Sequence, residues 1–397
     1  MTASTAETGR IAGTRQGIVL LLVSVMPMMA IISLVPVLPL LMREFGDVGG
    51  AEFLVPMALT IPALCVALLS PAAGWLSDRI GRKVLLVTAL IFYAAFGIIP
   101  WFLEDLFQII GARVALGATE AIIMTVATTL IGDYFEGERR EKWIALQVAI
   151  VSLAAIVLIA IGGGLGEAFG SRGPFLLYLL AIPVAFVAVA VLFEPQVSKA
   201  QTDSSTAFPY RAVLPLVAIT LGVGIVFYTV IVQLGPILGL SGAVSPGMIG
   251  AIGAAANICV GLGTLIFSRL KSNAGWPLLS LGLFIATIGY AGMALSTGLA
   301  PIAMFACLAC VGNGVMLPNM LAWVMRRLPS EMRGRGTGMW TGAFFLGQFL
   351  APLVTAAVIG ATSGLANALL AYAAVIGVGA IATMTFFSRK SHTRHTA

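Results

Sequence analysis

The sequence predicts an all-α membrane protein in which twelve transmembrane helices form two pseudo-symmetric bundles of six. The scarcity of charge, the number of long apolar segments and an internal repeat all predict this fold class. Of the 397 residues, 59% are apolar and only 10% are charged, and the mean hydropathy is +1.04. Soluble domains carry about 25% charged residues, so too little polar surface is present to cover a water-soluble globule. The composition also excludes a disordered chain, which would be rich in charge.

Twelve segments have the length and composition of membrane spans. A helix that crosses a bilayer needs about 20 mainly apolar residues. The predicted spans lie near Gly17–Met42, Phe53–Leu76, Val84–Trp101, Leu106–Ile131, Trp143–Phe169, Phe175–Phe193, Val213–Leu238, Met248–Phe267, Leu278–Ser296, Ile302–Met325, Thr337–Ile359 and Leu365–Phe387. We expect the first span to be retained, because no small-residue cleavage site follows it before Arg43.

The basic residues predict the orientation of the chain, because cytoplasmic loops are enriched in Lys and Arg. With the amino terminus inside, inner segments hold 19 of the 22 basic residues. These are Arg10, Arg15, Arg79, Arg82, Lys83, Arg139, Arg140, Lys142, Lys199, Arg211, Arg269, Lys271, Arg326, Arg327, Arg333, Arg335, Arg389, Lys390 and Arg394. We therefore expect a protein of the cell (inner) membrane with both termini cytoplasmic. The net charge of +6 then reflects topology, and no nucleic-acid partner is expected.

A polar segment divides the chain into two halves. Glu194–Tyr210 is the longest polar run between predicted spans. We predict a six-helix bundle over residues 1–194, a cytoplasmic linker over 195–210, and a second six-helix bundle with a basic tail over 211–397.

An internal repeat supports this division. Charged residues that follow the fourth span recur after the tenth at a constant offset in numbering. The aligned pairs are Glu138 with Glu331, Arg140 with Arg333, and Lys142 with Arg335. Paired halves around a central cavity are typical of secondary transporters. No Gly-x4-Gly-Lys-Ser/Thr loop occurs, which argues against transport powered by ATP.

The loop between the second and third spans carries a charged motif, GWLSDRIGRK, over residues 74–83. It resembles the signature loop of the major facilitator superfamily, Gly-x3-Asp-Arg-x-Gly-Arg-Arg/Lys. The matching positions are Gly74, Asp78, Arg79, Gly81, Arg82 and Lys83. The resemblance implies the twelve-helix transporter fold of this family, and a gating role for the loop. At the same offset, Lys271 replaces the Asp, so the second copy has lost the motif.

Each key residue of this loop has a physical role. Gly74 can let helices approach closely, and Gly81 can permit a tight reversal of the chain. The carboxylate of Asp78 is favoured at the amino end of a helix. The resemblance implies that this helix is span eleven, beginning near Gly336–Thr337, and that the contact latches the outward-open state. The alternative is a basic anchor beside a membrane face.

Two ionisable residues lie deep in the fourth span, where charge is costly and marks candidate functional sites. Glu120 lies about 20 Å from the outer end and Arg113 about 10 Å, since a helix rises 1.5 Å per residue. The two share a helix face but lie too far apart for an unaided ion pair. An apolar setting favours the protonated form of a carboxyl group, so Glu120 can carry a coupling proton, or can instead bind a cationic substrate. The alternative is a permanently protonated Glu120 with a structural hydrogen bond.

Further residues resemble the drug:proton antiporter group of the same superfamily. Arg113-x3-Gly117 is similar to the family's second motif, whose Arg is thought to assist proton transfer; the alternative is an Arg that reaches the outer headgroups. The antiporter motif in span five ends Gly-Pro-x-x-Gly-Gly, and here Ile159-Ala160 replaces its Gly-Pro. Four span-five glycines still permit close helix packing: Gly162, Gly163, Gly164 and Gly166.

The expected cavity is lined by spans one, four, seven and ten, with spans five, eight and eleven beside them, as the resemblance implies. Its candidate lining residues are Met26, Met29, Tyr228, Asn257, Asn313, Trp340, Phe344 and Gln348. Aromatic and Met side chains suit a hydrophobic or amphipathic ligand. For each Met or Phe the alternative is packing, and for each amide it is a hydrogen bond between helices.

These observations predict a proton-coupled antiporter that exports a hydrophobic or cationic small molecule by alternating access. The alternatives are a proton-coupled importer of a small metabolite, and a transport-inactive membrane sensor or scaffold. We expect no enzyme activity, because the spans hold no paired carboxylates, His–metal cluster or activated nucleophile. No cofactor and no metal site are expected; protons, membrane lipid and a small-molecule substrate are the expected partners of a monomer. Cys307-x-x-Cys310 is interpreted as a pair of packing residues.

Overall fold

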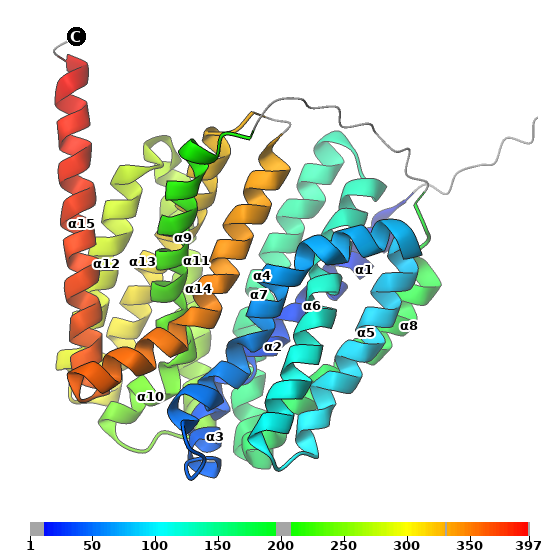
Figure 1. Cartoon of the computed structure of the whole chain (residues 1–397), viewed down its shortest axis with the longest axis horizontal. Coiled ribbons are helices and arrows are strands. Elements are labelled where there is room, and N and C mark those ends of the chain that lie inside the picture. The colour runs from blue at the N-terminus through cyan, green and yellow to red at the C-terminus, as the bar shows by residue number, and fades with distance from the viewer. Residues whose placement is uncertain (1–11, 196–207, 330–331, 396–397) are drawn as a thin grey trace, which may run out of the picture.

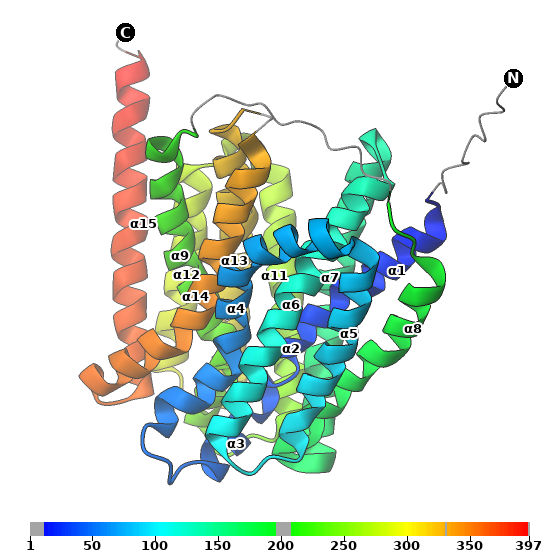
Figure 2. The same ribbon diagram turned by 45° about the vertical axis from the view of Figure 1, so that its right-hand side comes forward.

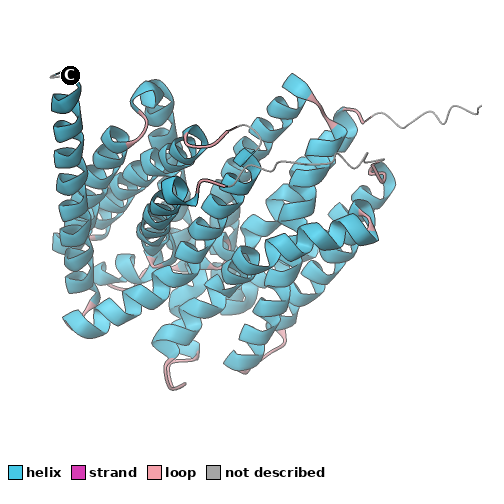
Figure 3. Ribbon diagram, turned by 45° about the horizontal axis from the view of Figure 1, so that its top comes forward, coloured by secondary structure: helices cyan, strands magenta, loops and turns pink. Residues whose placement is uncertain are grey.

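The computed structural model describes residues 12–195, 208–329 and 332–395, and in these ranges it consists of helices and loops without strands (Figure 3). Eleven continuous helical segments of the described chain are long and apolar enough to cross a membrane. The sequence predicts twelve spans, and the difference lies in Gly137–Val191, one 55-residue segment that contains both the fifth and the sixth. The chain reverses inside that segment (Figure 2), and Gly170 between its two helical parts has a φ of 71°. The fold of twelve spans is therefore confirmed.

The N-terminal half contains six spans, the first of which is divided into short pieces. These pieces are α1 (Thr14–Val25), η1 (Met26–Met28), α2 (Met29–Ile32), η2 (Val35–Val37) and α3 (Leu38–Glu44). The other five spans are α4 (Ala51–Ile80), α5 (Arg82–Ile98) with η3 (Ile99–Trp101), α6 (Leu106–Tyr134), α7 (Gly137–Phe169), and η4 (Gly170–Leu180) with α8 (Ala181–Val191).

The C-terminal half lies beside the N-terminal half and also contains six spans (Figure 1). They are α9 (Tyr210–Val232) with α10 (Leu234–Leu238) and η5 (Gly239–Ser241), α11 (Pro246–Leu270) with η6 (Lys271–Asn273), α12 (Trp276–Leu295), α13 (Leu299–Arg326), α14 (Arg333–Thr362) and α15 (Leu365–His395). Most of the predicted linker lies outside the described residues.

The helix bounds repeat between the halves. When the offset that aligns Glu138 with Glu331 is applied to α4, α6 and α7, their first residues fall at positions 244, 299 and 330. Their last residues fall at positions 273, 327 and 362, so α11, α13 and α14 agree to within three residues at every end. The offset found in a few charged residues therefore relates whole helices. Residues at equal positions in the two copies occupy equivalent places in the two bundles.

Prolines explain why the first span is broken. Pro27 lies in η1, Pro36 in η2 and Pro39 in α3. Proline has no N–H to donate to the preceding turn, so regular helical hydrogen bonding fails at each of these points. A turn at Ser33–Leu34 separates α2 from η2. The break leaves buried backbone carbonyl groups in the middle of the N-terminal half able to accept hydrogen bonds from side chains.

The two halves contact each other through α4 with α14 and through α7 with α11. We call the face on which α4 ends and α9 begins the linker face, and the face on which α7 ends and α11 begins the opposite face (Figures 1 and 2). Between Gly137 and Ala154 the residues of α7 are exposed or half-buried, and its buried residues all lie between Ala155 and Gly166. The halves therefore pack together at the opposite face, and the linker-face part of α7 is uncovered.

Glycines make the opposite-face packing possible. A Cβ atom on Gly162 would lie 2.2 Å from the carbonyl oxygen of Ser33, and one on Gly163 would lie 2.6 Å from that of Pro246. A Cβ on Gly166 would lie 2.4 Å from Val37 Cγ1. The expectation of close helix packing is confirmed at these three glycines. It is wrong for Gly164, where an added Cβ would meet nothing within 4 Å.

Candidate functional site

Arg113 lies at the centre of a buried hydrogen-bond cluster in the N-terminal half. Only 1% of its surface is exposed. Its Nε donates to the carbonyl oxygen of Ala58 at 3.0 Å, and one terminal nitrogen donates to that of Leu59 at 3.2 Å and to that of Ala30. The other terminal nitrogen donates to the hydroxyl of Tyr178 at 2.5 Å. Arg113 therefore connects spans one, two, four and six, and does not reach the outer headgroups.

Two tyrosines complete this cluster. The Tyr93 hydroxyl donates to the carbonyl oxygen of Met26 at 2.5 Å, and the rings of Tyr93 and Tyr178 lie 5.4 Å apart. The carbonyl groups of Met26 and Ala30, which accept from Tyr93 and from Arg113, belong to the broken first span. The Met26 carbonyl oxygen also accepts from the Met29 N–H within its own span, and its second lone pair accepts from Tyr93. The Arg113 cluster thus holds the irregular span in place.

Glu120 lies two helical turns farther along α6 and has no such partners. The residue is 4% exposed, and its Oε2 atom has no hydrogen-bond partner among the described residues. The donors of Arg113 are occupied by carbonyl groups and by Tyr178. An unpaired buried polar group is costly, which is why such a group marks a place where a proton or a ligand can bind.

Asn313 is the counterpart of Glu120 in the C-terminal half. The offset of the internal repeat relates the two residues, and each is the fifteenth residue of its helix, counted from Leu106 in α6 and from Leu299 in α13. Asn313 is 0% exposed, and neither polar atom of its side chain has a hydrogen-bond partner among the described residues. The two halves therefore place unpaired polar side chains at equivalent positions and equal depth.

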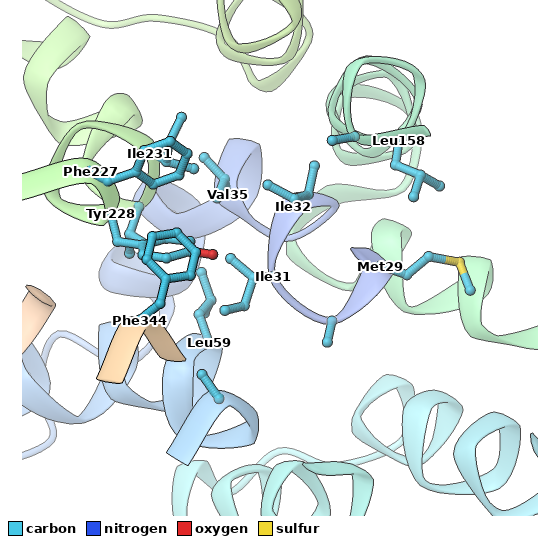
Figure 4. Packing of buried hydrophobic residues seen from close by; sticks show 14 of the residues in the cluster. Met29, Ile31, Ile32, Val35, Leu59, Leu158, Phe227, Tyr228, Ile231 and Phe344 are labelled. Carbon is cyan, nitrogen blue, oxygen red and sulfur yellow. The ribbon is translucent and has the colours of Figure 1, made fainter. Parts of the chain in front are cut away.

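An aromatic cluster from the C-terminal half lies beside the interface of the halves. Tyr228 of α9 and Phe344 of α14 have ring centroids 5.1 Å apart, and the Trp340 and Phe344 rings stack at 5.7 Å with an interplanar angle of 4°. Figure 4 shows Ile31 and Leu59, which belong to the N-terminal half, facing Tyr228 and Phe344. These rings thus lie where the two halves meet.

Helix α14 adds two unpaired polar atoms to this region. Trp340 Nε1 and Gln348 Oε1 are buried and have no hydrogen-bond partner among the described residues. Trp340, Phe344 and Gln348 are spaced four residues apart and so lie on one face of α14. The structure therefore brings together Tyr228, Trp340 and Phe344, with Gln348 on the same face of α14, and it buries Asn313 on α13.

The other three predicted lining residues have different surroundings. Met29 is fully buried, and its side chain points away from Tyr228 and Phe344 (Figure 4). Met26 is buried, and its carbonyl oxygen accepts the hydrogen bond from the Tyr93 hydroxyl. The Asn257 amide donates to the Gly253 carbonyl oxygen in its own helix at 2.9 Å. Among the described residues, no hydrogen bond joins these three to the aromatic cluster.

The signature loop is organised by a carboxylate from the end of the sixth span. Gly81 has a φ of 99°, so the expected tight reversal is confirmed. The Glu194 carboxylate accepts hydrogen bonds from the backbone N–H groups of Arg82 at 2.6 Å and Lys83 at 2.9 Å, at the first turn of α5. Close approach at Gly74 is not observed, because an added Cβ would be in ordinary contact with Thr125 at 3.8 Å.

Asp78 makes no contact with the start of α14 among the described residues. Its side chain is 68% exposed and pairs with Arg82 of the next turn at 3.3 Å. Arg82 also forms an ion pair with Asp133 at the end of α6. The resemblance assigns the Asp78 contact to an outward-open state. Here the signature loop is held within its own bundle.

Several residues of the site lie outside the sequence predictions. Tyr93 and Tyr178 were missed because nothing local distinguishes a Tyr that bonds a distant carbonyl group from a Tyr that packs. Asp133 and Glu194 each follow a long apolar run, and this is a signal that could have identified them. Cys307 and Cys310 are free thiols, and Cys310 is buried, which agrees with a packing role.

The chain matches the family model of the Major Facilitator Superfamily over residues 20–352 and again over 216–397. It is 29% identical over 157 residues to the multidrug transporter protein MdtP of Bacillus subtilis (strain 168), covering 40% of this chain and 28% of that protein. It is 30% identical over 185 residues to the class B tetracycline resistance protein of Escherichia coli, covering 46% of each chain. The chain thus spans less than half the length of these curated relatives.

The fold is similar to that of a solved transporter. A bacterial homologue of the human lysosomal transporter Spinster, in an inward-facing and unoccupied conformation, matches with a TM-score of 0.78 at 17% identity, covering 95% of this chain and 98% of that one. This likeness concerns the fold, and the family-model match establishes the family. The chain belongs to the major facilitator superfamily and has the multi-pass helical architecture of a membrane protein.

Proposed function

We propose that this transporter exports an apolar or cationic small molecule in exchange for protons, with Glu120 as the carboxyl group that binds both in turn. The observation that carries the proposal is the buried, unpaired Oε2 atom of Glu120. An Arg in hydrogen-bond contact would hold the carboxylate permanently ionised. Arg113 instead donates to backbone carbonyl groups and to Tyr178.

The buried aromatic and polar residues of the C-terminal half favour this class of substrate. The rings of Tyr228, Trp340 and Phe344 offer apolar faces, and aromatic faces attract cations. Asn313 and Gln348 supply hydrogen-bonding groups that fix orientation without adding charge. The names of two curated relatives, a multidrug transporter protein and a tetracycline resistance protein, support a drug-like substrate, and each aligns over only part of its length.

Arg113 has a supporting role in this proposal. It holds the broken first span through the carbonyl oxygen of Ala30. Orientation follows from the basic residues of the linker face, which is cytoplasmic in the proposal, in the cell membrane. A single chain supplies both bundles, so a monomer is sufficient.

Transport of ethidium, an aromatic monovalent cation, tests the proposal. Purified protein is reconstituted into liposomes, and a pH gradient is imposed across the membrane. We expect ethidium movement to follow the gradient, to lose that dependence in Glu120→Gln, and to keep it in the control Glu104→Gln, whose carboxyl group is exposed. A gradient response that Glu120→Gln leaves intact would remove Glu120 from the coupling step.

A further inference from the structure

We propose that Glu167 is a gating residue that closes the opposite face, and that its contact with α11 must break before this face can open. The carboxylate lies near the end of α7, in the N-terminal half. Its Oε2 atom accepts a hydrogen bond from the backbone N–H of Gly247 at 2.8 Å. Gly247 is the second residue of α11, so the contact joins the two halves.

Helix α11 leaves this donor without a partner of its own. The Ser245 side chain accepts from the N–H of Met248 at 3.3 Å, and Ile249 donates to the Ser245 carbonyl oxygen at 3.0 Å. Pro246 has no N–H. The N–H of Gly247 therefore points out of the helix, and Glu167 satisfies it. A carboxylate at this end of a 25-residue helix is also stabilised by the helix dipole.

Glycines in both helices allow the backbones to approach closely around the Glu167 contact. A Cβ atom on Gly247 would lie 2.8 Å from Glu167 Oε2, so the absence of a side chain permits the approach. One turn farther into each helix, Gly163 packs against Gly250. A Cβ atom added to either glycine would lie 2.9 Å from the Cα atom of the other. This glycine contact supplies close packing. The carboxylate adds a polar contact whose strength depends on its charge.

The two interfaces between the halves place the two contacts on different faces. Helices α7 and α11 meet at the opposite face, where α7 ends and α11 begins, and Glu167 lies there. Helices α4 and α14 form the second interface, and Asp78 lies at the linker face, where α4 ends and α14 begins. Only one of the two contacts between the halves is made here, because Glu167 is bonded to Gly247 of the other half, while Asp78 pairs with Arg82 of its own half. We infer that the two carboxylates close their faces alternately.

Spin-label distances test this proposal without substrate or a proton gradient. One pair of labels, at Glu104 and Ala243, spans the opposite face, and a second pair, at Glu141 and Ser272, spans the linker face; all four positions are exposed. The protein without these cysteines is labelled in parallel, to measure the signal of its native thiols. For Glu167→Gln we expect a longer opposite-face distance and a shorter linker-face distance, with the shifted population raised about 2- to 10-fold.

The controls separate gating from loosened packing. Glu52→Gln removes an exposed carboxylate from the same face, and we expect it to leave both distances unchanged. Glu167→Asp keeps the charge on a shorter side chain, and we expect a smaller shift than in Glu167→Gln. An unchanged distribution in Glu167→Gln, or a longer opposite-face distance without the shorter linker-face distance, would overturn the proposal. Neither outcome depends on the role of Glu120.

Discussion

Glu120 and Asn313 occupy the same position in two copies of one helix, and both are buried with polar atoms that have no partner among the described residues. One half thus contributes a group that can change its charge, and the other contributes a neutral amide. This asymmetry suits a carrier in which a single proton site is paired with a fixed polar contact. Because each residue can be substituted alone, proton coupling and substrate binding can be tested separately.

Replacing the amide should weaken substrate binding and leave coupling intact. Asn313→Leu keeps the approximate volume and removes both hydrogen-bonding groups. Since a net hydrogen bond contributes about 0.5–1.5 kcal/mol, we expect ethidium affinity to fall about 2- to 10-fold, measured by fluorescence titration of the purified protein. The pH-gradient dependence of transport should persist. Loss of that dependence in Asn313→Leu would mean that the two positions do not act separately.

The Arg113 cluster should be a main source of stability. Tyr178→Phe removes the hydroxyl that accepts from Arg113, and a hydrogen bond to a charged group contributes about 1.5–3 kcal/mol. We expect a melting temperature several degrees lower in detergent, measured by intrinsic fluorescence. Tyr210→Phe, at an exposed position, should melt like the unsubstituted protein. Equal melting temperatures for Tyr178→Phe and Tyr210→Phe would contradict this role.

Two neighbouring glycines should respond oppositely to the same substitution. In Gly162→Ala the new methyl group would meet the Ser33 carbonyl oxygen, so the helices must separate. Overpacking of this kind costs about 1–3 kcal/mol, and we expect a lower melting temperature. Gly164→Ala points into open space and should be neutral or slightly stabilising, because Ala favours helix. If both variants melt alike, the packing of α7 against the broken first span is not as described.

Asp78 should affect turnover more than stability. Its exposed pair with Arg82 contributes at most about 1 kcal/mol, so Asp78→Asn should melt within a degree or two of the unsubstituted protein. Transport rate should fall about 2- to 10-fold, because the carboxylate is needed in the state in which it meets α14. Ethidium binding should remain measurable. Normal turnover with lost binding would refute the gating role.

The composition and the signature loop were enough to predict the twelve-helix fold, because charge scarcity and apolar run length depend only on local sequence. Arg113 and Glu120 could be singled out for the same reason, since charge is rare in spans. Their different surroundings could not be predicted. Whether Arg113 meets Tyr178 or a headgroup depends on how spans one, two and six pack around it. The contact of Glu167 could not be predicted either, because it depends on where α11 of the other half begins.

The most direct test of the proposed coupling is proton release on ligand binding. Purified protein in a weakly buffered detergent solution is mixed with ethidium, and a pH indicator reports protons set free. If the cation displaces a proton from Glu120, the unsubstituted protein and Glu104→Gln release protons on binding, whereas Glu120→Gln binds without release. Equal release from Glu120→Gln, at matched occupancy of ethidium, would contradict the assignment of Glu120 as the shared site.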